Sequence, residues 1–465
     1  MGENTREIVL DTLLELEKGR EYSHRLIKAV LDKYDYLAAR DKAFIKRLTE
    51  GVLERRLEFD YYLDHFSSVP VRKMKPLIRN LLYLSLYQLL YMDGIPDSAV
   101  CNEACRLAAK RGFQNLKGFV NGVLRSIARQ KDSLPLPDQE TQRDLYDSVK
   151  YSMPLEITRM WFEEYGITVT ERLLEGLLNI HPVSLRFRMG LSAEEREGWV
   201  ERIRESGARI KESPYLPYVY TVENTESIAA LPGFSQGVFT VQDASSALAV
   251  EAAGIGPKDF VVDVCAAPGG KTLLAAERAK RVLARDVSEA KEALILENAE
   301  RMGAENITVQ VYDATHTDEA LLEKADVLFL DVPCSGLGVL GKKRDIKYHV
   351  TKESMAELEK LQKLIFEKSW GYVKPGGTLV YSTCTIHRGE NEDMVRYITE
   401  HFPFEPESIE PFLPKAILRQ REQIRLQAKG GDLKLTQKEA SACIQLLPGY
   451  METDGFFIAR FRRTR

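Results

Sequence analysis

Hydrophobic residues recur at three- and four-residue spacing through the first 130 positions, which is the pattern of amphipathic helices. Proline and glycine interrupt this spacing at a few positions and so separate successive helices. The clearest helical segments are 6–19, 40–66, 74–92 and 116–130. The region is therefore predicted to be all-helical, and the polar, proline-containing stretch 131–142 is predicted to be a linker.

The pattern changes after the linker. Helical spacing together with two short runs, 183–189 and 218–222, indicates a small α+β connecting module. From residue 241 onward, apolar runs of strand length alternate with helical segments, which predicts a mostly parallel sheet with helices on both faces. The predicted strands are 260–265, 281–287, 307–313, 326–332, 377–384 and 455–461.

The predicted fold class is therefore α/β, preceded by helical and mixed regions. We divide the chain into an all-helical domain at 1–135, a connecting α+β module at 136–240 and a sheet domain at 241–465. Because ligands of such sheets bind beyond the carboxyl ends of the strands, residues at those ends are the candidates for a functional site.

Composition narrows the class of protein. Apolar residues make up 44% and charged residues 29% of the 465 residues, which is typical of a soluble globular chain. No apolar run approaches the roughly 20 residues that span a bilayer, and the acidic N-terminus does not fit a secretory signal. We therefore expect a cytoplasmic protein without a membrane segment. The six cysteines include no Cys-x-x-Cys pair, which predicts neither a metal site nor a disulfide framework.

Charge is distributed unevenly along the chain. The formal net charge is −4, but residues 1–130 carry 22 Lys and Arg against 17 Asp and Glu, a local net charge of +5. A locally basic region is compatible with nucleic-acid binding even when the whole chain is acidic, and it does not by itself demonstrate such binding.

The stretch FVVDVCAAPGGKT, residues 260–272, joins a predicted strand to a helix through a glycine turn. Its Gly-Lys-Thr ending resembles a phosphate-binding loop, but that motif needs a glycine where this chain has Cys265. The dinucleotide pattern G-x-G-x-x-G is absent here too. Asp331, which ends VLFLD, resembles the magnesium-binding aspartate of nucleotide hydrolases, so ATP remains an alternative ligand at this point.

Three further aspartates end successive predicted strands. Asp263 ends the first, Asp286 ends the second, where it can bind ribose hydroxyls, and Asp313 ends the third, where it can reach an adenine amino group. Any one of them is better explained as a turn residue or helix cap. A row of carboxylates repels a triphosphate, so the three together favour a nucleoside that carries a sulfonium cation, S-adenosylmethionine.

Cys334 and Cys384 occupy matching positions after two predicted strands that would be neighbours about 4.8 Å apart. A lone cysteine there is usually a core residue, whereas two matching ones indicate chemistry. A thiolate that adds to carbon 6 of cytosine makes carbon 5 reactive toward a sulfonium methyl group, and a second group must help the thiol leave. Asp331 could hydrogen-bond the base, and Lys271 could lower the pKa of a nearby thiol. The spacing does not tell which cysteine attacks.

Three motifs, DVCAAPGGKT, LDVPCSGLG followed by RDIK, and YSTCT with ENE, together resemble the RNA cytosine-5 methyltransferases of the Nop2/Sun type. The segments RDKAFIKRLTEGVLERR and LKGFVNGVLRSI are similar to the helical domain of the antitermination factor NusB. The combination resembles the RsmB/Sun group of bacterial small-subunit ribosomal RNA methyltransferases over nearly the whole chain. It implies a Rossmann-like, S-adenosylmethionine-dependent methyltransferase sheet preceded by an RNA-binding helical domain.

The resemblance also assigns roles. It implies that Cys384 is the nucleophile, that Cys334 assists product release and that Asp331 lies between cofactor and base. The catalytic role expected of Lys271, besides lining the cofactor, is the one given above, to lower the pKa of a nearby thiol. Asp286 would bind the ribose and Asp313 would lie near the adenine. The residues implied to line the cofactor are Cys265, Ala266, Ala267, Pro268, Gly269, Gly270, Lys271, Asp286, Asp313 and Asp331. The implied substrate is small-subunit ribosomal RNA, at the cytosine of position 967, with no metal, and we expect a monomer.

The chain departs from the family pattern after GLGVL, where GKKRDIKYH replaces the usual Arg-Arg-x-Pro-Asp-Ile-Lys-Trp. The basic character is kept, so we expect residues 342–347 to contact RNA phosphates, and Tyr348 and Phe234 are candidates for stacking on a base. The alternative function is a non-catalytic RNA-binding or ribosome-assembly factor with a degenerate methyltransferase domain. The intact cysteines and carboxylates favour the enzyme.

Overall fold

Two compact units make up the chain. The computed structural model describes residues 4–19, 21–179, 182–225, 227–428 and 435–465. One unit, called the helical unit, comprises Met1–Phe162 together with Lys342–His349. The other, called the sheet unit, comprises Glu163–Gly341 and Val350–Arg465. Residues 342–349 thus belong to the helical unit although both of their neighbours in the sequence belong to the sheet unit.

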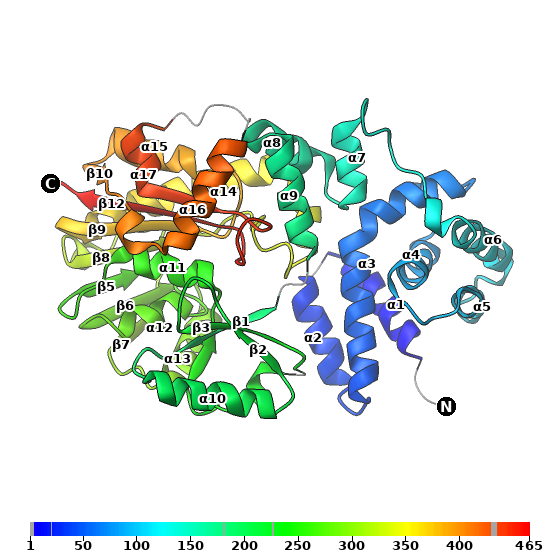
Figure 1. Ribbon diagram of the computed structural model, residues 1–465, viewed down its shortest axis with the longest axis horizontal. Coiled ribbons are helices and arrows are strands. Elements are labelled where there is room, and N and C mark those ends of the chain that lie inside the picture. The colour runs from blue at the N-terminus through cyan, green and yellow to red at the C-terminus, as the bar shows by residue number, and fades with distance from the viewer. Residues whose placement is uncertain (1–3, 20, 180–181, 226, 429–434) are drawn as a thin grey trace. The chain divides into compact units, whose positions relative to one another are not determined.

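The helical unit follows the predicted pattern. Asn4 caps the first helix by accepting a hydrogen bond from the Arg6 amide, and Pro76 opens the fourth, where its missing N–H has no cost. Apolar residues of five helices form one core, with Leu48, Leu81 and Leu107 fully buried. The helices are α1 (Thr5–Leu16), α2 (Ser23–Lys33), α3 (Ala39–Phe66), α4 (Pro76–Tyr91), α5 (Asp97–Lys110), α6 (Lys117–Ala128), α7 (Arg143–Lys150) and the start of α8 (Leu155–Tyr165) (Figure 1).

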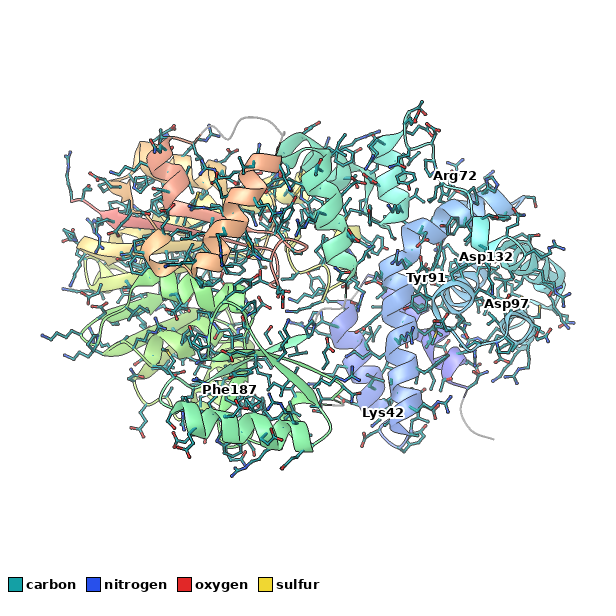
Figure 2. The ribbon with its side chains drawn as sticks, in the orientation of Figure 1. Lys42, Arg72, Tyr91, Asp97, Asp132 and Phe187 are labelled. Atoms are coloured by element: carbon teal, nitrogen blue, oxygen red, sulfur yellow. The ribbon has the colours of Figure 1, made fainter. Side chains whose placement is uncertain are left out.

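A small antiparallel sheet opens the sheet unit. Its strand order is β2-β3-β1-β4, from β1 (Val183–Phe187), β2 (Arg209–Glu212), β3 (Val219–Glu223) and β4 (Phe239–Val241). Phe187, labelled in Figure 2, is buried on β1, with its ring centre 5.1 Å from that of Tyr220 and 5.5 Å from that of Phe239. The predicted strands 183–189 and 218–222 are confirmed, whereas β2 and β4 were not predicted, since three or four residues are too short to show an alternating pattern.

The larger sheet has eight strands in the described residues, in the order β10-β12-β9-β8-β5-β6-β7, with β11 paired to β12. All six predicted strands are present: β5 (Phe260–Asp263), β6 (Arg281–Asp286), β7 (Ile307–Val311), β8 (Ala325–Asp331), β9 (Val373–Thr383) and β12 (Phe456–Arg463). The first five are parallel to one another, and β12 is antiparallel to β9. Two short strands, β10 (Phe404–Pro406) and β11 (Cys443–Leu446), were not predicted.

The helices of the sheet unit connect these strands. They are α9 (Ile167–Leu178), α10 (Ala193–Glu205), α11 (Ala244–Ala253), α12 (Gly270–Ala276), α13 (Glu289–Met302), α14 (Lys352–Ser369), α15 (Glu392–His401), α16 (Lys415–Gln427) and α17 (Gln437–Ala442). The order of the sheet reverses at β5, because β6 and β7 follow on one side of it while β8 and β9 lie on the other. A ligand of an open parallel sheet binds at this kind of switch point. The predicted α/β fold class is confirmed.

Residues 342–349 are held inside the helical unit by specific polar contacts. The Arg344 guanidinium donates to the carboxylates of Glu50 and Glu54 at 2.9 and 2.8 Å. Asp345 is buried and accepts a hydrogen bond from the Ser23 amide at 2.7 Å, at the N-terminus of α2, where the helix dipole favours a negative charge. Residues 342–349 therefore supply polar partners to both α2 and α3, although they lie far from these helices in the sequence.

The same segment corrects part of the RNA prediction. Lys347 is only 4% exposed, and its ammonium group donates to the carbonyls of Glu54 and Ser152 at 2.7 and 2.5 Å. The Tyr348 hydroxyl donates to the carbonyl of Leu53 at 2.5 Å. Because these side chains and Arg344 are engaged within the helical unit, the prediction that they contact RNA is wrong. Lys343 is exposed.

No helix of the described residues is both long enough and apolar enough to cross a bilayer. Within the same residues, no group of three or more His, Cys, Asp and Glu side chains is arranged to hold a metal ion.

Lys347 leads to a prediction about pH. Burial lowers the pKa of its ammonium group from 10.5 to about 7. Between these values the unfolded chain binds a proton that the folded chain lacks, so this group makes stability rise with pH, by at most about 1.4 kcal/mol per pH unit. In calorimetry from pH 7 to 10, the thermal midpoint of the wild type should rise relative to that of Lys347→Met. Lys343→Met is the matched control and should follow the wild type. Parallel curves for the wild type and Lys347→Met would contradict the prediction.

Candidate active site

The glycine turn joins the end of β5 to the start of α12. Gly269 has φ +103°, a backbone conformation that only glycine adopts readily, and it directly precedes α12. The peptide between Ala267 and Pro268 is cis. The Ala266 amide donates to the carbonyl of Arg285 and the Ala267 amide to the carboxylate of Asp286, both at 2.9 Å. The turn is thus fastened to the end of the neighbouring strand β6.

Asp286 is buried, and both of its carboxylate oxygens are engaged. One oxygen accepts from the Val287 amide and from the Lys291 ammonium, each at 2.8 Å. The other accepts only the Ala267 amide among the described residues, so a lone pair remains for a further donor such as a ribose hydroxyl. Asp313 lies beyond β7 with its side chain 48% exposed and accepts from the amide and hydroxyl of Thr315.

Asp263 is the most buried of the strand-end aspartates. Its Oδ2 accepts the Thr272 hydroxyl at 2.8 Å, while Oδ1 has no partner among the described residues. Burial raises the pKa of Asp263 to about 7. A buried oxygen without a partner is costly, so it marks a position where a donor can be accommodated.

Lys271 and Asp331 form an ion pair beneath the turn. Their Nζ and Oδ2 atoms are 2.6 Å apart, and Lys271 is nearly buried. The other oxygen of Asp331 accepts the Ser382 hydroxyl at 2.8 Å, and Lys271 also lies 4.9 Å from the centre of the Phe456 ring. Ser382 and Phe456 were not predicted as site residues, because nothing in their local sequence distinguishes them from other strand positions.

The two cysteines converge. The Sγ atoms of Cys334 and Cys384 lie 3.2 Å apart at one edge of the sheet, both are half-buried, and both are free thiols. The Gly338 amide donates to the Cys384 carbonyl at 3.0 Å, and the Gly455 amide donates to the Gly338 carbonyl at 2.8 Å. A Cβ atom on Gly338 would lie 2.0 Å from the Gly455 carbonyl oxygen, so this approach requires glycine.

The surroundings of Cys334 and of Cys265 raise the pKa values of both thiols. The hydrogen bond with Cys384 is the main cause that raises the pKa of Cys334 well above its usual range, and burial raises it further. The pKa of Cys265, in the glycine turn, is also raised, by burial and then by Asp263, Asp286 and Asp331. These carboxylates therefore surround the turn closely enough to act on the same side chain.

The residues at the turn fit a cationic nucleoside better than a triphosphate. The lysines nearest to the turn, Lys271 and Lys291, are both already paired with carboxylates. A triphosphate would need cations that are free to bind it. Asp286 offers a lone pair for a ribose, and the buried Asp263 oxygen can accept a hydrogen bond. The donor set is that of an S-adenosylmethionine site, which favours this cofactor over ATP.

A network beside the thiols was not predicted. Glu390, in the ENE motif, is fully buried and accepts hydrogen bonds from the amide and the hydroxyl of Ser335. The Ser335 hydroxyl also contacts that of Thr385 at 2.6 Å. The motif itself was visible in the sequence, but a sequence pattern does not show which residues a glutamate contacts across 55 positions.

Comparison with known proteins agrees with this geometry. The family model described as 16S rRNA methyltransferase RsmB/F matches residues 254–462, and the NusB family model matches residues 3–129. The chain is 34% identical to the probable ribosomal RNA small subunit methyltransferase B of Bacillus subtilis, and 29% identical to the ribosomal RNA small subunit methyltransferase B of Klebsiella pneumoniae. Each match covers 99% of both chains.

Solved structures share the fold. The crystal structure of PH0851 superposes with a TM-score of 0.76 at 22% identity, covering 99% of each chain. A methyltransferase homolog protein from Pyrococcus horikoshii superposes with a TM-score of 0.56 at 26% identity, covering 70% of this chain and 99% of that one.

The parallel sheet, its glycine turn, the strand-end carboxylates and the adjoining thiols together define an S-adenosylmethionine-dependent methyltransferase. Identity over the full length places the chain more narrowly. It belongs to the family of ribosomal RNA small subunit methyltransferase B, with a NusB-type helical region ahead of the catalytic sheet. The family resemblance of the three motifs is confirmed.

The approach of the two thiols can be tested chemically. Diamide removes two electrons and two protons from a pair of neighbouring thiols, so it should join Cys334 and Cys384 in one disulfide within the chain. Mass spectrometry of unreduced peptides should detect this bond, and Cys334→Ser should abolish it. Cys443→Ser, which changes a buried cysteine on β11, should leave it intact. Glutathione added to the same sample reports whether diamide has reacted completely. If the glutathione is fully oxidised while Cys334 and Cys384 remain free thiols, the described geometry is contradicted.

Proposed function

We propose that this protein transfers a methyl group to carbon 5 of a cytosine in small-subunit ribosomal RNA. The observation that carries the proposal is the 3.2 Å approach of the Cys334 and Cys384 sulfurs beside Asp331, at the edge where the glycine turn lies. The relatives bear the name of methyltransferases of this RNA. The target is proposed to be the cytosine that corresponds to position 967 of the small-subunit RNA.

Roles for the cysteines follow from the family and the chemistry. In the proposal Cys384 loses its proton and its sulfur bonds to carbon 6 of the base, which makes carbon 5 nucleophilic. After methylation of carbon 5, its proton passes to water, the double bond forms again and the sulfur–carbon bond breaks, so that Cys384 leaves as a thiolate. Cys334 assists this release. The thiol of Cys334, whose pKa is raised, can donate a hydrogen bond to the sulfur of Cys384 and stabilise its thiolate.

The cofactor supplies the electrophilic methyl group when bound. We propose that the turn from Cys265 through Lys271 holds it, with Asp286 on the ribose and Asp313 near the adenine. Asp331 is proposed to lie between cofactor and base. Hydrogen bonds from Lys271 and Ser382 fix the orientation of the Asp331 carboxylate. The role of Lys271 in the proposal is therefore to hold Asp331 in place.

For the three regions of the chain, we propose that residues 1–135 bind the RNA and that residues 241–465 catalyse methyl transfer. Residues 136–240 connect these two domains. The net charge of +5 in residues 1–130 and the NusB match support an RNA-binding role. The exposed Lys343 is a further candidate for phosphate contact. We propose a monomer that acts in the cytoplasm, where its RNA substrate is assembled.

The catalytic roles give a paired prediction. With S-adenosylmethionine and unmodified small-subunit RNA, Cys384→Ala should lose methyl transfer by at least about 10³-fold, because the covalent route is removed. Cys334→Ser should instead accumulate a covalent protein–RNA adduct on a denaturing gel, since attack proceeds and release is slowed. Cys101→Ala, which changes a buried cysteine of α5, is the control and should keep wild-type activity. Full activity of Cys384→Ala would refute the assignment of the nucleophile.

Cofactor binding gives a separate prediction. Asp286→Asn removes a charged acceptor that the ribose would use, so the Kd for S-adenosylmethionine in calorimetric titration should rise about ten- to 150-fold, which corresponds to about 1.5–3 kcal/mol. Asp326→Asn is the control, because Asp326 lies near the start of β8, where it accepts a hydrogen bond from the Phe260 amide at the start of β5, and not at the turn. An unchanged Kd for Asp286→Asn would contradict the cofactor site.

A further inference from the structure

Glu390 is a buried carboxylate that the proposed mechanism does not use. It is 0% exposed and lies in the loop between β9 and α15. One oxygen accepts the Ser335 amide at 2.9 Å and the side-chain amide of Gln362 at 2.8 Å. The other accepts the Ser335 hydroxyl at 2.5 Å and lies 3.4 Å from Nδ1 of His387. Such a carboxylate is retained inside a protein only when its hydrogen-bond partners are held in place.

Glu390 is linked to the residues that follow the two cysteines, directly to Ser335 and through Ser335 to Thr385. Ser335 follows Cys334, and Thr385 follows Cys384. The two hydroxyl groups are 2.6 Å apart. Each hydroxyl has one proton, and that of Ser335 is donated to Glu390, so the Thr385 hydroxyl donates to Ser335. The chain of hydrogen bonds therefore runs from one cysteine turn, through the other, to a single carboxylate.

Gln362 and Tyr381 add further hydrogen bonds to the network around Glu390. Gln362 of α14 donates its second amide proton to the carbonyl of Pro333, directly before Cys334, at 2.9 Å. The Tyr381 hydroxyl donates to the backbone carbonyl of Glu390 at 2.7 Å. Ser335, Thr385 and Gln362 are all less than 9% exposed, so water does not compete for these bonds. The turns that carry the thiols cannot separate without breaking buried hydrogen bonds to Glu390.

We infer that Glu390 is a positioning residue for the thiol pair, acting through Ser335 and Thr385 to hold Cys334 and Cys384 face to face. The inference rests on the proposed function for its meaning in catalysis. It assigns to Glu390, the first glutamate of the ENE motif, the role of fixing the distance between the attacking sulfur and the assisting sulfur.

The charge of Glu390 has a second effect on the pair. It is among the causes that raise the pKa of Cys334, after the hydrogen bond with Cys384 and burial. The other titratable groups of this region are Tyr381 on β9, His387 in the same loop, Glu359 on α14 and Asp331 on β8. A negative charge on Glu390 therefore helps Cys334 to keep its proton.

The test compares two glutamates of the same motif. Glu390→Gln removes the charge and cannot accept from every donor that Glu390 binds. Glu392→Gln is the matched control, because Glu392 is also buried but contacts neither Ser335 nor Thr385 in the described network. Both variants are made in the full chain. The pH dependence of Cys334 alkylation by iodoacetamide is measured by mass spectrometry, and methyl transfer to unmodified small-subunit RNA is measured as kcat and KM.

For Glu390→Gln we expect the alkylation midpoint of Cys334 to fall by about one pH unit, because a nearby negative charge is lost. We expect kcat to fall at least about tenfold with an unchanged KM for RNA, since a loosened thiol pair slows the chemistry and not the binding. Glu392→Gln should keep the wild-type midpoint and kcat.

Wild-type values for Glu390→Gln in both assays would overturn the inference, and so would equal shifts in both variants or a change confined to KM. If Glu390→Gln does not fold, Ser335→Ala decides, because it breaks the chain of hydrogen bonds and keeps the carboxylate. An unchanged kcat in Ser335→Ala would then overturn the inference, and a reduced kcat at constant KM would support it. The alkylation assay needs no RNA, so absence of methyl transfer by the wild type would refute only the proposed function.

Discussion

The parallel pairing of β8 with β9 is the constraint on which the site depends. Leu330 pairs with Tyr381 and Asp331 with Ser382, so both strands leave the sheet at the same edge and at the same level. Cys334 follows three residues after Asp331, and Cys384 follows two residues after Ser382. This register brings two thiols that are 50 residues apart in sequence to within 3.2 Å of each other. A slip of one residue would turn the strand's side chains to the opposite face and separate the groups.

Charge pairing explains how so many carboxylates share one small region. The carboxylates of Asp286 and Asp331 each form an ion pair with a lysine, and the Ala267 amide of the glycine turn donates a further hydrogen bond to Asp286. Asp263 forms no ion pair with any of the described residues, and burial raises its pKa to about 7, so it exists partly in the protonated form near pH 7. The site thus combines paired charges with one carboxyl group that changes its protonation close to neutral pH.

Local sequence patterns predicted most of the fold and the place of several candidate residues at one edge of the sheet. Long strands such as β8 and β9 are apolar over many positions. Asp263 and Asp286 end strands, and the two cysteines lie within three residues of strand ends, so their place at the sheet edge could be inferred. The short strands β2, β4, β10 and β11 could not, because each has too few residues to show a period. They are stabilised by pairing with longer neighbours.

The contacts that sequence reasoning missed join distant segments. Ser335, Gln362 and Glu390 look like ordinary polar residues until the fold brings them together. The segment 342–349 was misread for a related reason. Its basic composition is real, but Arg344 and Lys347 find carboxylates and carbonyls of α3 as partners. Composition indicates charge and does not tell where that charge will be buried.

The place of this segment also has a consequence for how the protein is made. Ser23 and Asp345 are 322 positions apart. At a synthesis rate of about 5–20 residues per second, Asp345 leaves the ribosome roughly 16–65 s after Ser23. During that time the nascent helical unit has an uncapped α2 and two carboxylates on α3, Glu50 and Glu54, that still lack their arginine. The helical unit is therefore finished only when Asp345, which is translated long after α2 and α3, has been made.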